Sequence, residues 1–144
     1  MIANRSIPNC TVIPQLVYAD VAKAAEWLCG AFGFTLRLTI GSHRIQLNAG
    51  DGALVVMEPK AAAAPGAQGY LPSEFGHVMI RVTEIDKHCE RAKLHGAKIV
   101  RALEDHVYGE RQYTAEDLAG RLWTFSQSIA DVAPEAWGGV SVNL

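Results

Sequence analysis

The sequence has no long apolar run, no concentration of basic residues and few cysteines. No stretch approaches the ~20 apolar residues of a membrane-spanning helix, so no membrane partner is expected. The first residues lack a basic region followed by an apolar core, and no secretory signal peptide is therefore expected. The formal net charge of −2 provides no basic surface of the kind that binds nucleic acid.

The three cysteines, Cys10, Cys29 and Cys89, are odd in number and far apart. Their spacing fits neither a zinc site nor a disulfide framework, and a reducing cytoplasm is the expected location. No histidine or aspartate spacing beside Cys29 or Cys89 supports a nucleophile, so both are interpreted as small core residues.

What the chain does have is the composition of a folded domain. Of its 144 residues, 49% are hydrophobic and 19% are charged. These values are typical of globular proteins, and a chain of this length is expected to form one domain with a substantial core.

The first half of the chain predicts a strand, a helix and three further strands. Asp20 is placed to cap the helix and Gly33 to end it in a left-handed conformation. Residues 49–52 read as a hairpin turn. The apolar and polar periodicities place the elements at residues 11–18, 21–32, 34–40, 43–48 and 53–58. The strand 34–40 alternates strictly and is expected to be half-buried.

The second half repeats this order after an alanine-, glycine- and proline-rich segment. Residues 59–75 are interpreted as a linker, with a mobile flap as the alternative. Thr83 and Asp86 are spaced as in a capping box. The repeated elements are predicted at residues 77–82, 83–95, 98–103, 110–114 and 121–127. The tail, 128–144, has no assigned structure.

The two halves align on their first and last strands. Leu16 aligns with Ile80, and the turn glycine Gly52 aligns with Gly120. A single βαβββ unit is too small to cover its own sheet, so two units should pack together. We therefore predict an α+β fold in which tandem βαβββ units, 11–58 and 76–127, form a curved mixed sheet with helices outside. Both units belong to one domain, 11–127.

Two motifs strengthen this interpretation. The second unit opens with Gly76-His77 and closes with Tyr108-Gly109-Glu110-Arg111, followed by an Asp-x-x-Gly-x-x-Trp-x-Phe pattern at 117–125. These features resemble the vicinal oxygen chelate superfamily, which holds glyoxalase I, bleomycin-resistance proteins, fosfomycin-resistance enzymes and extradiol dioxygenases. The resemblance covers residues 11–127 and is closest to the glyoxalase/bleomycin-resistance-like branch. It fits the fold more specifically than any one activity.

In metal-dependent members of this superfamily, the ligands come from the first and last strands of each unit. The repeat places the corresponding positions at Ile13, Val56, His77 and Thr124. A divalent metal needs about three or four nitrogen, oxygen or sulfur donors, and His77 alone is a good one. No metal or other cofactor is therefore expected, and His77 would be a ligand if a metal did bind.

Two interpretations of His77 and Glu58 stay open. Gln15 and Glu58 lie two residues from Ile13 and Val56, so both are predicted to share the face of the cleft. Glu58 could orient the His77 imidazole as an acid/base pair. Alternatively, Glu58 ends its strand in solvent and His77 only makes a hydrogen bond in the cleft.

Other side chains are candidates for binding a ligand in the cleft. An aromatic ring and a guanidinium on a concave sheet suit a planar or anionic molecule, although alternate members of this strand could face water. The candidates are Tyr108, Arg111, Gln112, Tyr113 and Thr124. Trp123 and Phe125 are predicted to face the helices as core residues. His88 and His95 share one helix face and are predicted to be exposed.

The leading hypothesis is a metal-free small-molecule binding protein of the bleomycin-resistance type, with its ligand in the cleft. The alternative is a glyoxalase-like lyase or dioxygenase that uses a non-standard metal or acid/base site around His77. A sheet that closes only partway leaves edges and apolar rims, so a homodimer is expected.

Overall fold

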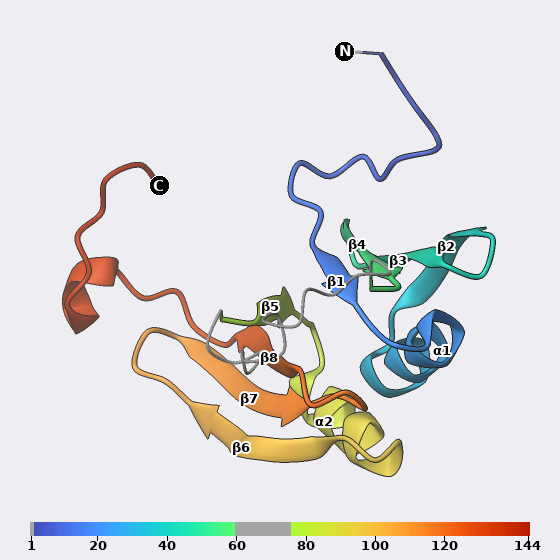
Figure 1. Cartoon of the computed structure of the whole chain (residues 1–144). Helices are drawn as coiled ribbons and strands as arrows, with labels where there is room; N and C mark the ends of the chain where they lie inside the picture. The colour runs from blue at the N-terminus through green and yellow to red at the C-terminus, as the bar shows by residue number, and fades with distance from the viewer. Residues whose placement is uncertain (1, 60–75) are drawn as a thin grey trace, which may run out of the picture.

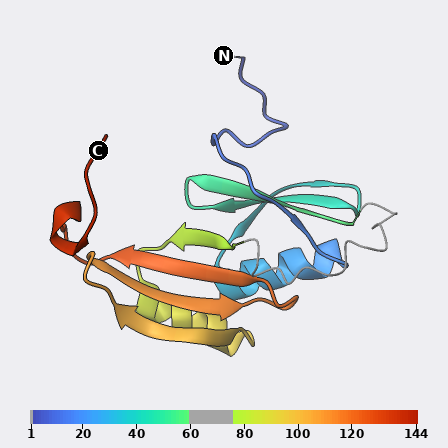
Figure 2. The same cartoon turned by 60° about the vertical axis from the view of Figure 1, so that its left-hand side comes forward.

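The computed structural model describes residues 2–59 and 76–144, so the predicted linker lies, except for residue 59, outside the described residues (Figures 1 and 2). The first unit contains β1 (Gln15–Val17), α1 (Val21–Phe32), β2 (Thr35–Ile40), β3 (Arg44–Ala49) and β4 (Gly52–Met57). The second unit contains β5 (Val78–Arg81), α2 (Ile85–Leu94), β6 (Lys98–Asp105), β7 (Glu110–Glu116) and β8 (Leu122–Ser128). A short 3-10 helix, η3 (Pro134–Trp137), follows in the tail.

Each unit forms a four-stranded mixed sheet. The strand orders are β1-β4-β3-β2 and β5-β8-β7-β6. In each sheet the first strand pairs in parallel with the last, and the remaining pairs are antiparallel. The predicted α+β fold of two βαβββ units is confirmed. The strands of each unit pair among themselves, so each unit has its own sheet. None of the helices within the described residues is long and apolar enough to cross a membrane.

Helices α1 and α2 contact each other, and each covers one face of its own sheet (Figure 1). Phe32 at the end of α1 packs against Trp123 and Phe125 of β8, with ring centroids 5.6 and 4.8 Å apart. Trp123 and Phe125 are fully buried, as the strand alternation predicts. One hydrophobic core therefore crosses both units and leaves the opposite face of each sheet uncovered by helix.

The helix ends confirm one cap and correct another. The Asp20 carboxylate accepts a 3.0 Å hydrogen bond from the amide of Lys23, and Gly33 ends α1 with φ at 77°. The predicted capping box of α2 is wrong, because Glu84 occupies the cap position without a side-chain bond. A side chain from β8 takes over this role, since Gln127 Oε1 accepts a 2.9 Å bond from the amide of Ile85.

The predicted alternation of β2 is also wrong in part. Leu36 and Ile40 are 59% and 40% exposed, although the pattern placed both on the buried face. The register against β3 shifts between Leu36 and Leu38, which is the mark of a β-bulge. Because a bulge inserts one extra residue, it changes the face that each following side chain occupies, and this accounts for Ile40, which pairs with Arg44. Leu36 precedes the shift and pairs with the buried Leu47, so its exposure reflects the position of β2 at the edge of the sheet.

Candidate functional site

The second sheet has a helix-covered face and an open face, and the strand register decides which side chains reach each. Directly paired residues in neighbouring strands point to the same face. Two successive rows across the open face consist of Met79, Thr124, Thr114 and Arg101, and of Arg81, Ser126, Gln112 and Glu104. The open face is therefore mainly polar, whereas the opposite face belongs to the core.

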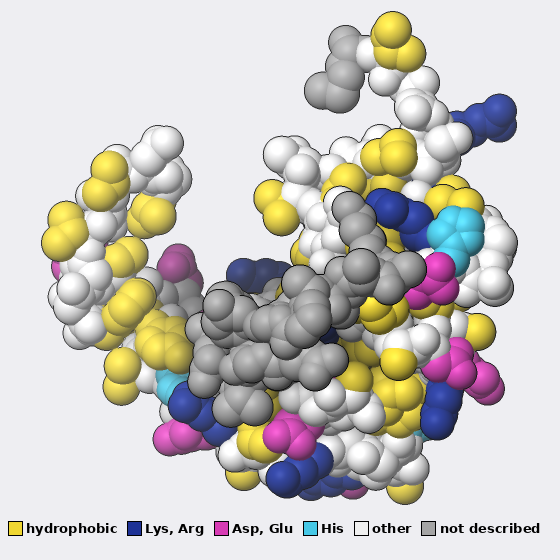
Figure 3. All heavy atoms as spheres, viewed as in Figure 1, with side chains coloured by type: hydrophobic (Ala, Val, Ile, Leu, Met, Phe, Trp, Pro, Cys, Tyr) yellow, Lys and Arg dark blue, Asp and Glu magenta, His cyan; other side chains and the backbone are white. Residues whose placement is uncertain are grey.

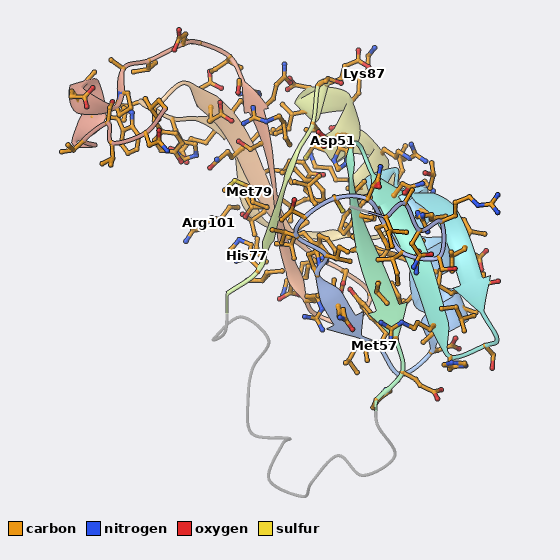
Figure 4. All side chains as sticks on the ribbon, turned by 90° about the horizontal axis from the view of Figure 1, so that it is seen from above. Asp51, Met57, His77, Met79, Lys87 and Arg101 are labelled. Carbon is orange, nitrogen blue, oxygen red and sulfur yellow. The ribbon has the colours of Figure 1, made fainter. Side chains whose placement is uncertain are left out.

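A cavity of about 310 Å³ lies on this open face. Its lining combines two histidines, two tyrosines, an arginine and hydroxyl and amide side chains, including His77, Arg101, His106, Tyr108, Gln112 and Thr124. Figure 4 shows His77, Met79 and Arg101 gathered beside β5 on this side of the sheet. The cavity thus brings together residues from β5, β6, β7, β8 and the turn between β6 and β7.

A first hydrogen-bond chain runs into the sheet from His77. His77 Nε2 lies 2.7 Å from Thr124 Oγ1, which in turn lies 2.7 Å from Thr114 Oγ1. Both threonines are buried, while the imidazole is exposed at the mouth of the cavity. This hydrogen-bond chain holds the imidazole through its Nε2 atom and leaves the rest of the ring available to a ligand.

A second chain fixes the amide of Gln112. Tyr108 Oη donates to Gln112 Oε1 at 3.0 Å, and Gln112 Nε2 donates to Ser126 Oγ at 3.0 Å. Ser126 Oγ then donates to Glu110 Oε1 at 2.7 Å. Hydrogen bonds from Ser128 and Ser126, together with the charge of Arg81, hold the pKa of Glu110 below its usual range. The chain therefore ends on an ionised acceptor, which sets the direction of every donor before it.

Three aromatic rings, which we call the aromatic wall, border the cavity: His106 and Tyr108 line it, and Trp137 packs behind them on Tyr108. The rings of His106 and Tyr108 stack with centroids 5.0 Å apart and an interplanar angle of 7°. The ring of Trp137 in η3 packs against Tyr108 at an interplanar angle of 53°, with centroids 5.3 Å apart. Stacked rings of this kind suit a planar ligand group. The tail has no periodic sequence pattern, so the contribution of Trp137 does not follow from the sequence.

The tail reaches this wall because β8 ends against the turn between β6 and β7. The carbonyl of Gly109 accepts a 2.8 Å hydrogen bond from the amide of Ile129. Gly109 has φ at 84°, and a Cβ at this position would collide with the carbonyl oxygen of Ala130. Glycine is required here both by its conformation and by the close approach of the tail.

Four of the candidate residues bring their side chains together in this cavity, namely His77, Tyr108, Gln112 and Thr124, and Tyr113 is also part of its lining. The side chains of Arg111 and Tyr113 turn to the helix-covered face instead. Arg111 pairs with Asp86 and Asp105 at 2.9 Å each, and Tyr113 Oη lies 2.6 Å from His88 Nδ1. Gln112, between them in the sequence, points into the cleft, because successive strand residues alternate faces.

The two predicted site residues of the first unit lie apart from this cavity. Gln15 Oε1 accepts a 3.1 Å bond from Arg44 and lines a separate cavity of about 420 Å³ on the open face of the first sheet. Glu58 is exposed just after β4. Among the described side chains, the hydrogen-bond partner of the His77 ring is Thr124 and not Glu58.

The structure also corrects the alignment of the last strands. Val55 pairs with Gln15 as Thr124 pairs with Met79, so Val55 and not Val56 is the counterpart of Thr124. Val56 is fully buried in the core. The error arises because the connection between β7 and β8 is longer than the turn between β3 and β4, so Gly52 and Gly120 are not equivalent. The same shift removes Glu58 from the face that holds Gln15.

The corrected set of inherited positions is Ile13, Val55, His77 and Thr124. Across residues 2–59 and 76–144, no three histidine, cysteine, aspartate or glutamate side chains are grouped to hold a metal ion. One imidazole and one neutral hydroxyl do not meet the donor number of a divalent metal site. The residues present therefore do not fit the divalent metal that the resemblance to metal-dependent members of the superfamily implies.

His88 departs from its predicted exposed position. Its Nε2 lies 2.8 Å from the carbonyl oxygen of Phe32, and its Nδ1 lies 2.6 Å from Tyr113 Oη. A carbonyl only accepts, so Nε2 carries the proton and Nδ1 accepts from the tyrosine hydroxyl. Burial, opposed by the Phe32 bond, lowers the pKa of His88. The ring is a neutral bridge between α1 of one unit and β7 of the other.

Comparison with known sequences gives a family and uncharacterized relatives. A model described as the Glyoxalase/Bleomycin resistance protein/Dioxygenase superfamily matches residues 8–125. An uncharacterized protein from Mycobacterium bovis is 28% identical over 127 residues, covering 83% of this chain and 84% of that protein. A relative from Mycobacterium tuberculosis is also 28% identical and also uncharacterized.

Comparison with solved structures agrees with the family match. TioX from Micromonospora sp. ML1 is 31% identical with a TM-score of 0.67, covering 86% of this chain and 100% of that chain. The fosfomycin resistance protein FosX from Listeria monocytogenes is 17% identical with a TM-score of 0.63, covering 89% of this chain and 95% of its own. At that identity the likeness to FosX shows the fold alone.

Proposed function

The chain belongs to the glyoxalase/bleomycin resistance protein/dioxygenase superfamily, the vicinal oxygen chelate group, and on this basis we propose that it is a small-molecule binding protein. The ligand lies in the cavity on the open face of the second sheet. The observation that carries the proposal is the juxtaposition of the aromatic wall with two oriented hydrogen-bond chains. A site of this kind offers stacking to a planar group and directed polar contacts to its edge.

The charges of the cavity refine the ligand class. Arg101 is exposed at its rim, and the imidazole of His77 stands free on one side. Glu104, paired in the same row as Gln112, limits the net positive charge. A planar molecule with a single anionic group, oriented toward Arg101, is the class that these side chains accommodate best.

The polar groups of the cavity are bonded to each other, and this favours binding over metal-assisted chemistry. Thr124 is hydrogen-bonded to both His77 and Thr114, and Gln112 is hydrogen-bonded to both Tyr108 and Ser126. Binding groups that are held in place by their neighbours lose little conformational entropy when a ligand arrives. The proposed function therefore needs no metal or other cofactor.

One observation favours an enzyme as the second candidate. The exposed imidazole of His77 is held by a buried hydroxyl pair, which is an arrangement suited to moving a proton at a ligand atom. In that case the protein would be a glyoxalase-like lyase that works through acid/base chemistry at His77. This candidate would be favoured by a ligand that the wild type converts to a product and that the His77→Ala variant does not convert.

The test of binding uses 8-anilinonaphthalene-1-sulfonate, an aromatic anion whose fluorescence rises in apolar sites. We expect saturable binding that weakens about 3- to 10-fold in Tyr108→Ala and in Thr124→Val, since each loses one contact or one hydrogen bond. Thr39→Val is the matched control, because Thr39 is an exposed residue of β2 in the other sheet. Equal affinity in all variants would contradict this location of the site.

The proposed assembly is a homodimer. Strands β1, β2, β5 and β6 are the edges of their sheets in the described part of the chain. The C-terminal segment carries exposed apolar side chains, with Val140, Val142 and Leu144 81%, 91% and 95% exposed, and Figure 3 shows hydrophobic groups along it. A second copy would cover both features.

A cytoplasmic location is proposed from the three unpaired cysteines.

A further inference from the structure

The N-terminal segment lies across the open face of the first sheet. Arg37 Nη2 donates to the carbonyl oxygens of Arg5 and Ile7, at 3.0 and 3.1 Å. Gln46 Nε2 donates to the carbonyl oxygen between them, that of Ser6, at 3.0 Å. Two side chains thus hold three consecutive backbone carbonyls of the segment, which we call the strap (residues 5–8).

The two donors form a built site, because each orients the other. Gln46 is 2% exposed, and its Oε1 accepts a hydrogen bond from Arg37 Nη1. That bond fixes the amide so that Nε2 points to the strap. Both terminal nitrogens of Arg37 donate hydrogen bonds, Nη1 to Gln46 and Nη2 to the strap. The guanidinium and the amide are therefore held ready for carbonyl oxygens.

The strap contributes few side-chain contacts apart from one proline. Pro8 is buried, whereas Arg5, Ser6 and Ile7 are exposed overall. Next to the strap, a cavity of about 420 Å³ extends over Ile13, Gln15, Arg44 and Val55. The face therefore recognises the main chain of the strap and has further room beyond it.

We propose that the strap is an internal ligand of the first sheet, and that Arg37 and Gln46 form a binding site for a short peptide-like molecule with a turned backbone, as the strap itself has at residues 5–7. The recognition elements are three successive carbonyl oxygens that a turn presents to one side, and a small apolar ring or side chain in the place of Pro8. Such a molecule displaces the strap and occupies the cavity beside Gln15. The proposal concerns the first sheet only and is independent of binding on the second.

The test uses the full chain and a fluorescent, N-acetylated, C-amidated peptide of sequence Ala-Ser-Ile-Pro-Asn. The peptide copies residues 5–9 with alanine first, because only the carbonyl of Arg5 is bound. Pro8→Asp places a charge in the buried position and should loosen the strap. We expect fluorescence anisotropy to give at least 5-fold tighter binding to Pro8→Asp than to the wild type.

Adding Arg37→Ala to Pro8→Asp should weaken this binding at least 10-fold, since two of the three hydrogen bonds are lost. Adding Lys23→Ala, an exposed position on α1, should not change it. Affinity that is the same in Pro8→Asp and wild type, or that survives Arg37→Ala, would overturn the proposal.

A measurement on the wild type decides the matter even if Pro8→Asp does not fold. Trypsin cleaves after Arg5, and the strap protects this bond while it is docked. Excess unlabelled peptide should displace the strap and accelerate cleavage after Arg5 at least 3-fold, while cleavage at other sites is unchanged. Cleavage that is unaffected by the peptide would contradict displacement. Because both readouts lie on the first unit, failure of the second-sheet site would not affect either.

Discussion

The hydroxyl of Tyr18 donates a 2.6 Å hydrogen bond to the Asp117 carboxylate, joining the end of β1 to the loop between β7 and β8. The same oxygen, Oδ2, accepts from Trp123 Nε1 at 3.0 Å, and Oδ1 accepts from the amides of Ala119 and Arg121. Four donors therefore satisfy one buried carboxylate. Burial and the charge of Asp117 raise the pKa of Tyr18, which stays protonated as the donor.

Tyr18→Phe removes one of these donors and leaves the other three. We expect the free energy of unfolding to fall by about 1–3 kcal/mol, because a buried charged acceptor loses a partner. Urea denaturation monitored by circular dichroism measures this change. Tyr108→Phe is the matched control, since its hydroxyl bonds a neutral amide in a partly exposed cleft and should cost less. An unchanged midpoint for Tyr18→Phe would show that the joint does not contribute to stability.

The half-buried His88, which is neutral in its bonded state, makes stability depend on pH. Its folded pKa is lowered from the ordinary 6.5, so on acidification the unfolded chain takes up a proton first. The contribution is complete above pH 6.5 and decreases as the pH falls from 6.5 toward the folded pKa. We expect His88→Gln to flatten the loss of stability between about pH 7.5 and about pH 5.5, whereas His95→Gln keeps it. Parallel curves for wild type and His88→Gln would contradict this assignment.

The donor set around His77 predicts that the protein, purified without chelators, carries no stoichiometric divalent metal. Elemental analysis of the wild type and of His77→Ala is the measurement. About one metal per chain in the wild type and none in the variant would contradict the prediction and would favour the enzyme over the binding protein. Metal-free wild type with weaker binding of the aromatic anion to His77→Ala is the expected result.

The exposed edges and the apolar tail predict a homodimer. Sedimentation velocity at micromolar concentration should give a species of about twice the 15.6 kDa chain mass. Val140→Ser combined with Val142→Ser should shift the species toward the monomer, because both side chains are exposed in the single chain. Lys23→Ser, at an exposed position on α1 and away from the sheet edges and the tail, is the control. A wild type that sediments as a clean monomer would rule out the dimer.

The repeat, the helices and most strands were predictable because they follow from periodicity and end signals within short windows. Asp20 and Gly33 did in the structure what these residue types do locally. The faces of the strands were harder, because a period of two does not say which set faces the cleft. The sequence therefore offers Arg111, Gln112 and Tyr113 together as cleft candidates, although only the side chain of Gln112 points into the cleft.

Other errors came from relations between distant parts of the chain. The one-residue error at Val56 reflects unequal turn lengths, which only the observed register reveals. The sequence predicts His88 in solvent, because its partners, the carbonyl of Phe32 and the hydroxyl of Tyr113, are distant in sequence. Trp137 lies in an irregular tail and has no periodic pattern to identify it.

The close approach of the tail to Gly109 ties the aromatic wall to a single backbone position. A side chain at Gly109 would push the start of the tail away and carry Trp137 with it, while every hydrogen bond within the cavity could persist. A substitution at Gly109 alone can therefore change the width of the cleft during evolution, with no change among the residues that touch a ligand. Relatives with identical cavity linings need not share ligand size.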